Sequence, residues 1–200
     1  MVFVLDDDPA VREALSGLLR SAGLRAVLFA TAAEFLRAKV KETPACLVLD
    51  LQLPDISGLE LQRSLAETAG PPIVFISGHA NIPSSVRAMK AGAIEFLVKP
   101  FSDEELLAAI ASAIEHDRGE RQSRSELVGL REAYGHLSRR EREVLPLVVA
   151  GMTNRESAVN LGIAEITLQV HRGQIMRKLG ARSVPDLVRM AGKLGLSEPR

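Results

Sequence analysis

The sequence predicts an α/β protein, a doubly wound (βα)5 parallel sheet followed by a small all-α domain of four helices. Five short apolar segments alternate with segments of helical spacing up to residue 118, and no strand pattern returns after residue 136. Residues 1–118 hold 11 Lys and Arg against 16 Asp and Glu, whereas residues 119–200 hold 14 against 9, so the net charge changes from −5 to +5. We therefore expect two domains, 1–118 and 137–200, joined by a linker over 119–136 that is at least partly helical.

Five segments of the first domain are rich in β-branched or bulky apolar residues and predict the strands of its sheet. They lie at 2–5, 25–29, 46–49, 73–76 and 94–98. Between them, apolar residues recur at the helical period, as at Val11, Leu15 and Leu18. Strands that alternate with helices form parallel sheets covered on both faces. The first strand is short, which predicts a weak edge.

The patterns in the second half of the sequence predict helices only. Ser138 and Glu141 form a capping box, Thr153 and Glu156 form a second one, and Gly162 ends the helix that follows. A longer helix is expected from about 164 to 179 and a last one over 184–194.

Composition excludes several classes of protein. A single cysteine, Cys46, cannot form a disulfide framework or a multi-cysteine zinc site, and it favours a reducing, cytoplasmic setting. The four histidines lack the spacing of a metal site. No apolar run approaches the roughly 20 residues that a membrane-spanning helix needs, and no signal peptide is expected.

Charged and polar residues follow the predicted strands of the first half. Asp6, Asp7 and Asp8 follow the first strand, Asp50 ends the third, and Ser77 and Lys99 follow the fourth and fifth. Because the carboxyl ends of parallel strands share one edge, these side chains should meet there. Clustered carboxylates attract a hard divalent cation such as Mg²⁺, and the ammonium and hydroxyl suit a phosphoryl group. A carboxylate is then the best nucleophile, forming an acyl phosphate.

These residues match a known pattern. The segments Val-Leu-Asp6-Asp7, Leu-Val-Leu-Asp50-Leu-Gln-Leu-Pro-Asp-Ile-Ser-Gly58, Phe-Ile-Ser77-Gly-His and Ala-Gly-Ala-Ile-Glu-Phe96-Leu-Val-Lys99-Pro-Phe resemble the motifs of response-regulator receiver domains, which have a flavodoxin-like fold. The resemblance implies that Asp50 accepts a phosphoryl group from a sensor histidine kinase. It also implies Mg²⁺ (or Mn²⁺) held by Asp6, Asp7, Asp50 and the backbone carbonyl of Gln52.

The same resemblance implies a conformational change in the receiver on phosphorylation. Ser77 and Lys99 would contact the phosphate, Phe96 would turn inward, and the Lys99–Pro100 peptide bond would be cis. Receivers of this kind dimerise on the surface that holds Arg87, Lys90 and Glu95. Asp8 lies one place beyond the motif and is expected to be a charge at a helix N-terminus.

The span 137–196 resembles the four-helix, LuxR-type helix-turn-helix, so the whole chain resembles the FixJ/NarL group of two-domain regulators, the FixJ subgroup most closely. One inward stripe of the longer helix is formed by Leu168, His171, Ile175 and Leu179. The opposite face is left for the DNA major groove, and it presents Ile166, Gln169, Val170, Gly173 and Arg177. Gln169 could pair with adenine and Val170 could touch a thymine methyl group. The residues expected to reach phosphates are Asn154, Arg155, Thr167, Arg172 and Lys178.

The second half also departs from the family pattern. Ala164 stands where Ser or Thr usually caps the recognition helix, and Ser157 replaces an aliphatic residue. Ile166 and Gln169 stand where lysines are common. Losing two cations should lower nonspecific DNA affinity and its salt dependence, so that binding depends more on dimerisation.

We interpret the chain as a transcription factor controlled by phosphorylation and not as an enzyme, its own catalysis being limited to self-phosphorylation and slow acyl-phosphate hydrolysis. The expected partners are a sensor histidine kinase, a roughly palindromic DNA operator bound by the phosphorylated homodimer, and RNA polymerase as a further candidate, with no membrane. One alternative is a receiver that switches a protein-docking module instead of a DNA-binding one. Another is a Mg²⁺-dependent phosphatase, because Asp6-Asp7-Asp8 supplies an Asp-x-Asp spacing.

Overall fold

The computed structural model describes residues 1–38, 43–68, 70–78 and 82–196. The chain divides into two compact units, Met1–Arg121 and Gln122–Arg200. Helix α5, Asp103–Gly135, contributes residues to both units and contains most of the expected linker. Each unit has a hydrophobic core of its own.

The first unit is built on a five-stranded parallel sheet with the strand order β2-β1-β3-β4-β5. The strands are β1 Val2–Leu5, β2 Ala26–Phe29, β3 Cys46–Asp50, β4 Ile73–Ser77 and β5 Glu95–Val98. This confirms the doubly wound fold. The prediction of a weak edge at the first strand is wrong, because β1 lies between β2 and β3 and all four of its residues are buried.

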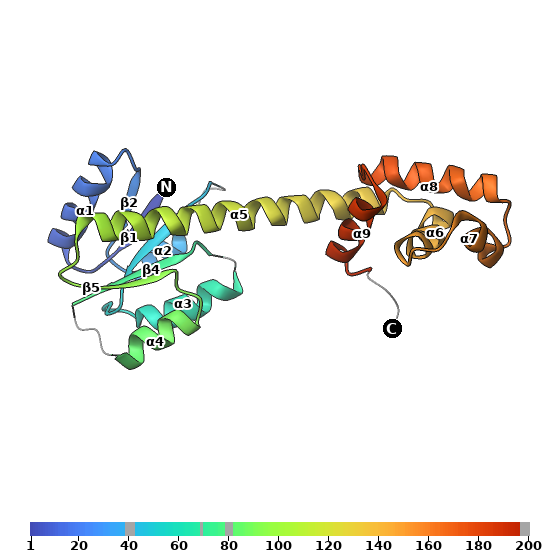
Figure 1. The fold of residues 1–200 in the computed structure, drawn as a ribbon. Coiled ribbons are helices and arrows are strands. Elements are labelled where there is room, and N and C mark those ends of the chain that lie inside the picture. Colours follow the sequence, from blue (N-terminus) through green and yellow to red (C-terminus); the bar gives the residue numbers. More distant parts are fainter. Residues whose placement is uncertain (39–42, 69, 79–81, 197–200) are drawn as a thin grey trace. The chain divides into compact units, whose positions relative to one another are not determined.

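Helices cover both faces of the sheet. They are α1 Pro9–Ser21, α2 Ala32–Arg37, α3 Gly58–Glu67 and α4 Ile82–Lys90, together with the first part of α5. Leu19 of α1 and Ile110 of α5 pack on the face that presents Val4 and Val48. Helices α2, α3 and α4 pack on the other face, where Phe75 is fully buried (Figure 1). Burial on both faces explains why the strands read as continuous apolar runs.

Gly58 fixes how closely α3 approaches the end of β3. A Cβ atom at this position would lie 2.7 Å from the backbone oxygen of Asp50 and 3.0 Å from the Phe75 ring. Only glycine permits this approach. The start of α3 therefore holds the backbone of Asp50 in place.

The second unit packs the end of α5 against α6 Arg139–Val149, α7 Asn154–Leu161, α8 Glu165–Leu179 and α9 Val184–Lys193. Both expected capping boxes form, at Ser138 with Glu141 and at Thr153 with Glu156. Within the described chain, Ala164 precedes α8 without a side-chain cap. Among the described residues, no helix is both long and apolar enough to cross a membrane.

Candidate phosphorylation site and nucleic-acid interface

The carboxyl edge of the sheet brings together side chains that are far apart in sequence. The Lys99 ammonium lies 2.8 Å from Asp6 Oδ2 and 3.1 Å from Asp50 Oδ1, so it bridges the ends of β1 and β3. The Asp6 side chain is 1% exposed and that of Asp50 is 11% exposed. Two buried carboxylates therefore share one cation.

The backbone holds both carboxylates from the other side. The amide of Asp8 donates to Asp6 Oδ1 at 2.9 Å, and the amide of Gln52 donates to Asp50 Oδ2 at 2.7 Å. Burial raises the pKa of Asp50 above its ordinary value, and the hydrogen bonds from Gln52 and Lys99 oppose this shift without cancelling it. Burial acts to lower the pKa of Lys99, but Asp6 and Asp50 more than offset it, so that pKa is raised. The pocket has more negative charge than its lysine neutralises.

Ser77 and the Lys99–Pro100 bond complete this edge. Ser77 is the last residue of β4 and is 1% exposed, and its carbonyl accepts the amide of Lys99 at 2.9 Å. The peptide bond between Lys99 and Pro100 is cis, as the resemblance implied.

The other predicted metal ligands lie nearer the surface. Asp7 and Gln52 are both exposed. Within the described residues, no three His, Cys, Asp or Glu side chains form a group that could hold a metal ion. The structure thus brings Asp6 and Asp50 together around the Lys99 ammonium. Asp7 follows Asp6 in the sequence but, among the described residues, does not complete a three-carboxylate cluster. Asp8 accepts the amide of Ala10 and caps α1, as expected.

Phe96 is half-buried on β5, where its ring stacks on that of Phe75 with centroids 5.8 Å apart. Arg87 and Lys90 on α4 and Glu95 on β5 are exposed. His79, expected in a loop beside the site, lies outside the described residues.

Two supports of this edge were not predicted. The Arg12 guanidinium donates to the backbone oxygens of Asp6 at 2.7 Å and Asp7 at 2.9 Å. The Asp55 carboxylate accepts the amides of Ala32 and Ala33 at the start of α2. Although burial acts to raise the pKa of Asp55, these amides more than offset it and hold that pKa below its ordinary value. No spacing pattern in the sequence signals either contact, because both depend on how the loops fold back.

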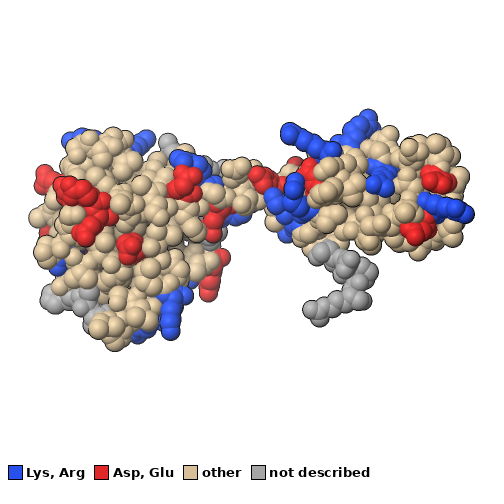
Figure 2. Space-filling model, in the orientation of Figure 1, with Lys and Arg blue, Asp and Glu red and all other residues tan. Residues whose placement is uncertain are grey.

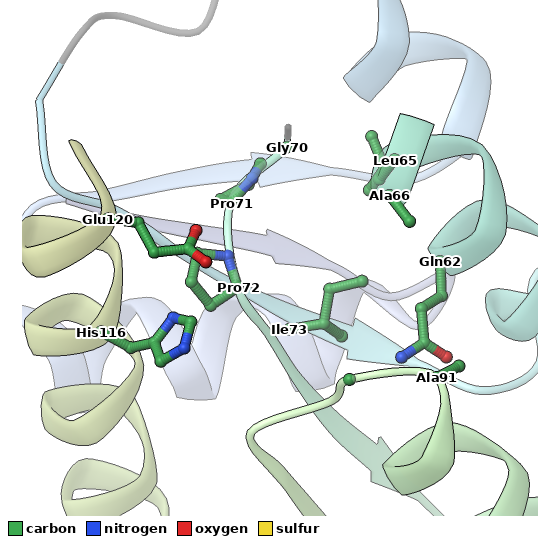
Figure 3. Close-up of a pocket in the computed structure, with 11 residues that line it drawn as sticks. Gln62, Leu65, Ala66, Gly70, Pro71, Pro72, Ile73, Ala91, His116 and Glu120 are labelled. Carbon is green, nitrogen blue, oxygen red and sulfur yellow. The ribbon is translucent and has the colours of Figure 1, made fainter. Parts of the chain in front are cut away.

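A separate cavity of about 210 Å³ opens at the opposite end of β4, beside Ile73. Figure 3 shows His116 and Glu120 of α5 on one side and Gln62 of α3 on the other. Gln62 Nε2 donates to the backbone oxygen of Ala88, while its buried Oε1 has no hydrogen-bond partner within the described chain. This cavity does not include the carboxylates around Lys99.

In the second unit, α8 packs one side into the core and exposes the other. Leu168, Ile175 and Leu179 are buried and His171 is half-buried, which agrees with the predicted inward stripe. The residues of the predicted reading face are exposed, namely Ile166, Gln169, Val170, Gly173 and Arg177. Thr167, which was predicted to contact phosphates, is exposed as well.

The basic residues predicted to contact phosphates differ in their surroundings. Arg155 at the start of α7 is exposed. Arg172 donates to Asn154 Oδ1 at 2.8 Å, which ties α8 to α7. Lys178 donates to Glu141 Oε2 at 2.7 Å and to the backbone oxygen of His136 at 3.2 Å. A DNA contact by Lys178 would compete with this ion pair inside the unit.

A buried aspartate pocket on a (βα)5 sheet, joined to a helical unit with one exposed helix face, defines a two-domain regulator of the receiver class. Comparison with known proteins identifies both parts. The family described as "Response regulator receiver domain" matches residues 2–111, and the family described as "Bacterial regulatory proteins, luxR family" matches residues 135–191.

Relatives cover the chain along almost its whole length. Nodulation protein W of Bradyrhizobium diazoefficiens is 46% identical over 98% of this chain and 87% of that protein. Transcriptional regulatory protein FixJ of Azorhizobium caulinodans is 42% identical over 98% of this chain and 93% of that protein. The solved structure of response regulator StyR has a TM-score of 0.83 and 47% identity, over 96% of this chain and 98% of that one.

The chain belongs to the response-regulator family, with a receiver domain followed by a LuxR-type DNA-binding domain. It is a transcriptional regulator of the two-component type, as the sequence predicted.

Proposed function

We propose that Asp50 is the phosphoacceptor of this regulator and that a sensor histidine kinase supplies the phosphoryl group. The observation that carries this proposal is the Lys99 ammonium bridging Asp6 and Asp50 at 2.8 and 3.1 Å. An Asp50 oxygen attacks the phosphorus of a phosphohistidine, so an O–P bond forms as the N–P bond breaks and the imidazole leaves. Lys99 then pairs with the incoming phosphoryl oxygens, and Ser77 donates a hydrogen bond to them.

The surplus negative charge of the pocket fits a divalent cation. Asp6, Asp7, Asp50 and the backbone carbonyl of Gln52 would hold Mg²⁺ or Mn²⁺, all through the oxygen ligands that such ions prefer. When bound, the ion supplies positive charge beside the transferring phosphoryl group. This chain's own catalysis is then limited to its self-phosphorylation and the slow hydrolysis of the acyl phosphate.

Phosphorylation is proposed to change the surface of α4 and β5. Phe96 already packs against Phe75, and a shift of Ser77 toward the phosphate lets the Phe96 ring settle further inward. The neighbouring surface carries Arg87, Lys90 and Glu95 together with exposed apolar side chains. Ile82 is 80% exposed and Met89 is 43% exposed. Apolar side chains gathered among charges mark an interaction surface, and we assign it to the homodimer.

The dimer would present two copies of α8 to a roughly palindromic operator in the cytoplasm, with RNA polymerase as a further partner. Gln169 and Val170 read bases, while Asn154, Arg155, Thr167, Arg172 and Lys178 approach phosphates. We keep 1–118 as the phosphorylated part, 119–136 as the connection and 137–200 as the DNA-binding part.

The test is selection of binding sites from random DNA duplexes by the full chain, with and without beryllofluoride, a mimic of the phosphoryl group. We expect one roughly two-fold symmetric site, enriched more strongly with beryllofluoride. The matched control is Asp50→Asn, which should lose both acetyl-phosphate labelling and the response to beryllofluoride. Labelling that survives in Asp50→Asn would overturn the phosphoacceptor assignment. Retention of no duplex by the activated chain would overturn DNA binding and favour the protein-docking alternative.

A further inference from the structure

The base-reading end of α8 has an unusual composition for a DNA-binding surface. The sequence has no Lys or Arg between Arg155 and Arg172, a stretch that covers most of α7 and the first half of α8. The exposed residues in the first two turns of α8 are Glu165, Ile166, Thr167, Gln169 and Val170. This end of the helix therefore offers apolar groups, an amide, a hydroxyl and one carboxylate.

Two of these side chains are large, apolar and open to solvent. Ile166 is 67% exposed and Val170 is 56% exposed. They stand four residues apart, so they are neighbours on one face of the helix. The core takes Leu168, Ile175 and Leu179 from the opposite side of α8. Ile166 and Val170 therefore lie outside the hydrophobic core of their own unit.

The N-terminal residues of a recognition helix are those that meet base edges in the major groove. The chemical group there that suits an apolar side chain is the C5-methyl group of thymine. Basic side chains come before and after the pair in sequence, with Arg155 exposed on α7 and Arg177 exposed later on α8. Residues 119–200 have a net charge of +5, and Figure 2 shows Lys and Arg at several places on the second unit. The apolar pair Ile166 and Val170, in a basic unit, suits DNA, because DNA is a polyanion whose thymines carry methyl groups.

We propose that Ile166 and Val170 together read two thymine methyl groups in each half-site, which makes Ile166 a specificity-determining residue. The inference rests on the proposed DNA-binding function and goes beyond it by naming the chemical groups that are read. Burying one methyl group changes affinity by about fourfold. Because the pair contributes no charge, this part of the specificity should persist when added salt weakens the phosphate contacts.

The experiment uses the full chain, beryllofluoride and the duplex recovered by binding-site selection. Each thymine is replaced in turn by uracil, which removes the methyl group and leaves the base pairing intact. We expect affinity to fall about fourfold at two positions in each half-site and to stay unchanged at thymines outside it. The ratio of the affinities for the thymine duplex and the uracil duplex should stay constant as the salt concentration increases.

Two protein variants assign the methyl groups to their readers. Ile166→Ala should abolish the effect of uracil at one of the two positions and keep it at the other, and Val170→Ala should do the reverse. Val159→Ala is the matched control, because Val159 is 77% exposed on α7 and lies outside the pair. This control should keep both uracil effects. Circular dichroism of each variant checks that the unit stays folded.

The outcomes separate the inference from the function beneath it. If a duplex is bound and uracil has no effect at any position, or if Ile166→Ala keeps both effects, the methyl reading is overturned while DNA binding stands. If the activated chain retains no duplex, both are overturned, and the exposed pair is then a surface for a protein partner.

Discussion

Each domain of this regulator buries a carboxylate beside a lysine, but the two pairs differ in charge balance. In the receiver, Lys99 is shared by Asp6 and Asp50, and the pKa of Asp50 stays above its ordinary value because burial outweighs its hydrogen bonds. In the DNA-binding unit, Lys178 pairs with one carboxylate, that of Glu141, at 2.7 Å, and also donates to the backbone oxygen of His136. Burial acts to raise the pKa of Glu141, but Lys178 and the Ser138 amide more than offset it and hold that pKa below its ordinary value.

The difference separates the proposed phosphorylation site from a carboxylate that serves the fold. Glu141 also forms the capping box at the start of α6, so its Oε2 accepts from both the Ser138 amide and the Lys178 ammonium. Asp50 keeps an excess of negative charge that another cation can relieve. A buried carboxylate with a lowered pKa stabilises its domain when ionised, whereas one with a raised pKa makes its domain less stable when ionised.

The largest expected effect comes from removing the shared lysine. Lys99→Met leaves the buried Asp6 and Asp50 without their counterion, so the free energy of unfolding of the receiver should fall by about 3 kcal/mol at pH 7. Urea unfolding measures this change, and Mg²⁺ should restore part of the loss. Lys90→Met, at an exposed lysine of the same domain, should change stability by less than about 0.5 kcal/mol. Equal effects of the two substitutions would contradict the role given to Lys99.

Removing the charge of Glu141 from its ion pair with Lys178 should lower the free energy of unfolding by a smaller amount, and this loss should depend on pH. Glu141→Gln keeps the size of the side chain and removes the charge beside Lys178, so we expect about 1.5 kcal/mol of destabilisation at pH 7. Because the folded pKa of Glu141 is lowered, its contribution is present above its ordinary pKa of 4.5 and is lost as the pH falls through the folded pKa. Thermal unfolding followed from pH 7 down through the folded pKa, which lies below 4.5, measures it. Glu132→Gln, at an exposed glutamate of the same unit, is the control.

The pH dependence of stability due to Asp50 should have the opposite sign to that due to Glu141. The raised pKa of Asp50 means that ionisation is less favourable in the folded state, so stability due to this group falls as the pH rises from 3.8 through the folded pKa. Asp50→Asn should therefore be more stable than the parent at pH 7, by about 1 kcal/mol, and the gap should narrow toward pH 4. Urea midpoints at several pH values test this. A destabilised Asp50→Asn at pH 7 would remove the contrast with Glu141.

The smallest effect concerns Ser157 in α7, which is 0% exposed. Within the described chain its hydroxyl oxygen has no hydrogen-bond partner. Ser157→Ala removes this buried polar group and should stabilise the DNA-binding unit by about 0.5 kcal/mol without changing its DNA affinity. Ser138→Ala removes a helix cap instead and should destabilise the same unit by about 1 kcal/mol. Calorimetry of both variants checks the two signs.

Much of the fold could be predicted because the signals are local. Apolar runs identify the strands, and the capping boxes at Ser138 and Thr153 identify two helix starts within four residues each. The meeting of Asp6, Asp50 and Lys99 follows from one general rule about parallel sheets. The sequence could not show that the short first strand is internal, because strand order depends on contacts between distant segments.

The sequence by itself determined the two-part organisation, the helices and strands, and the residues that gather at the end of the sheet. Tertiary structure alone decided that Arg12 donates to the backbone beside Asp6 and that Asp55 accepts amides at the start of α2. It also decided that Lys178, which the sequence predicted to contact DNA, pairs with Glu141. Secondary structure depends on neighbours within a few residues, which the sequence displays directly. The partner of a long charged side chain depends on which distant groups the completed fold places within its reach.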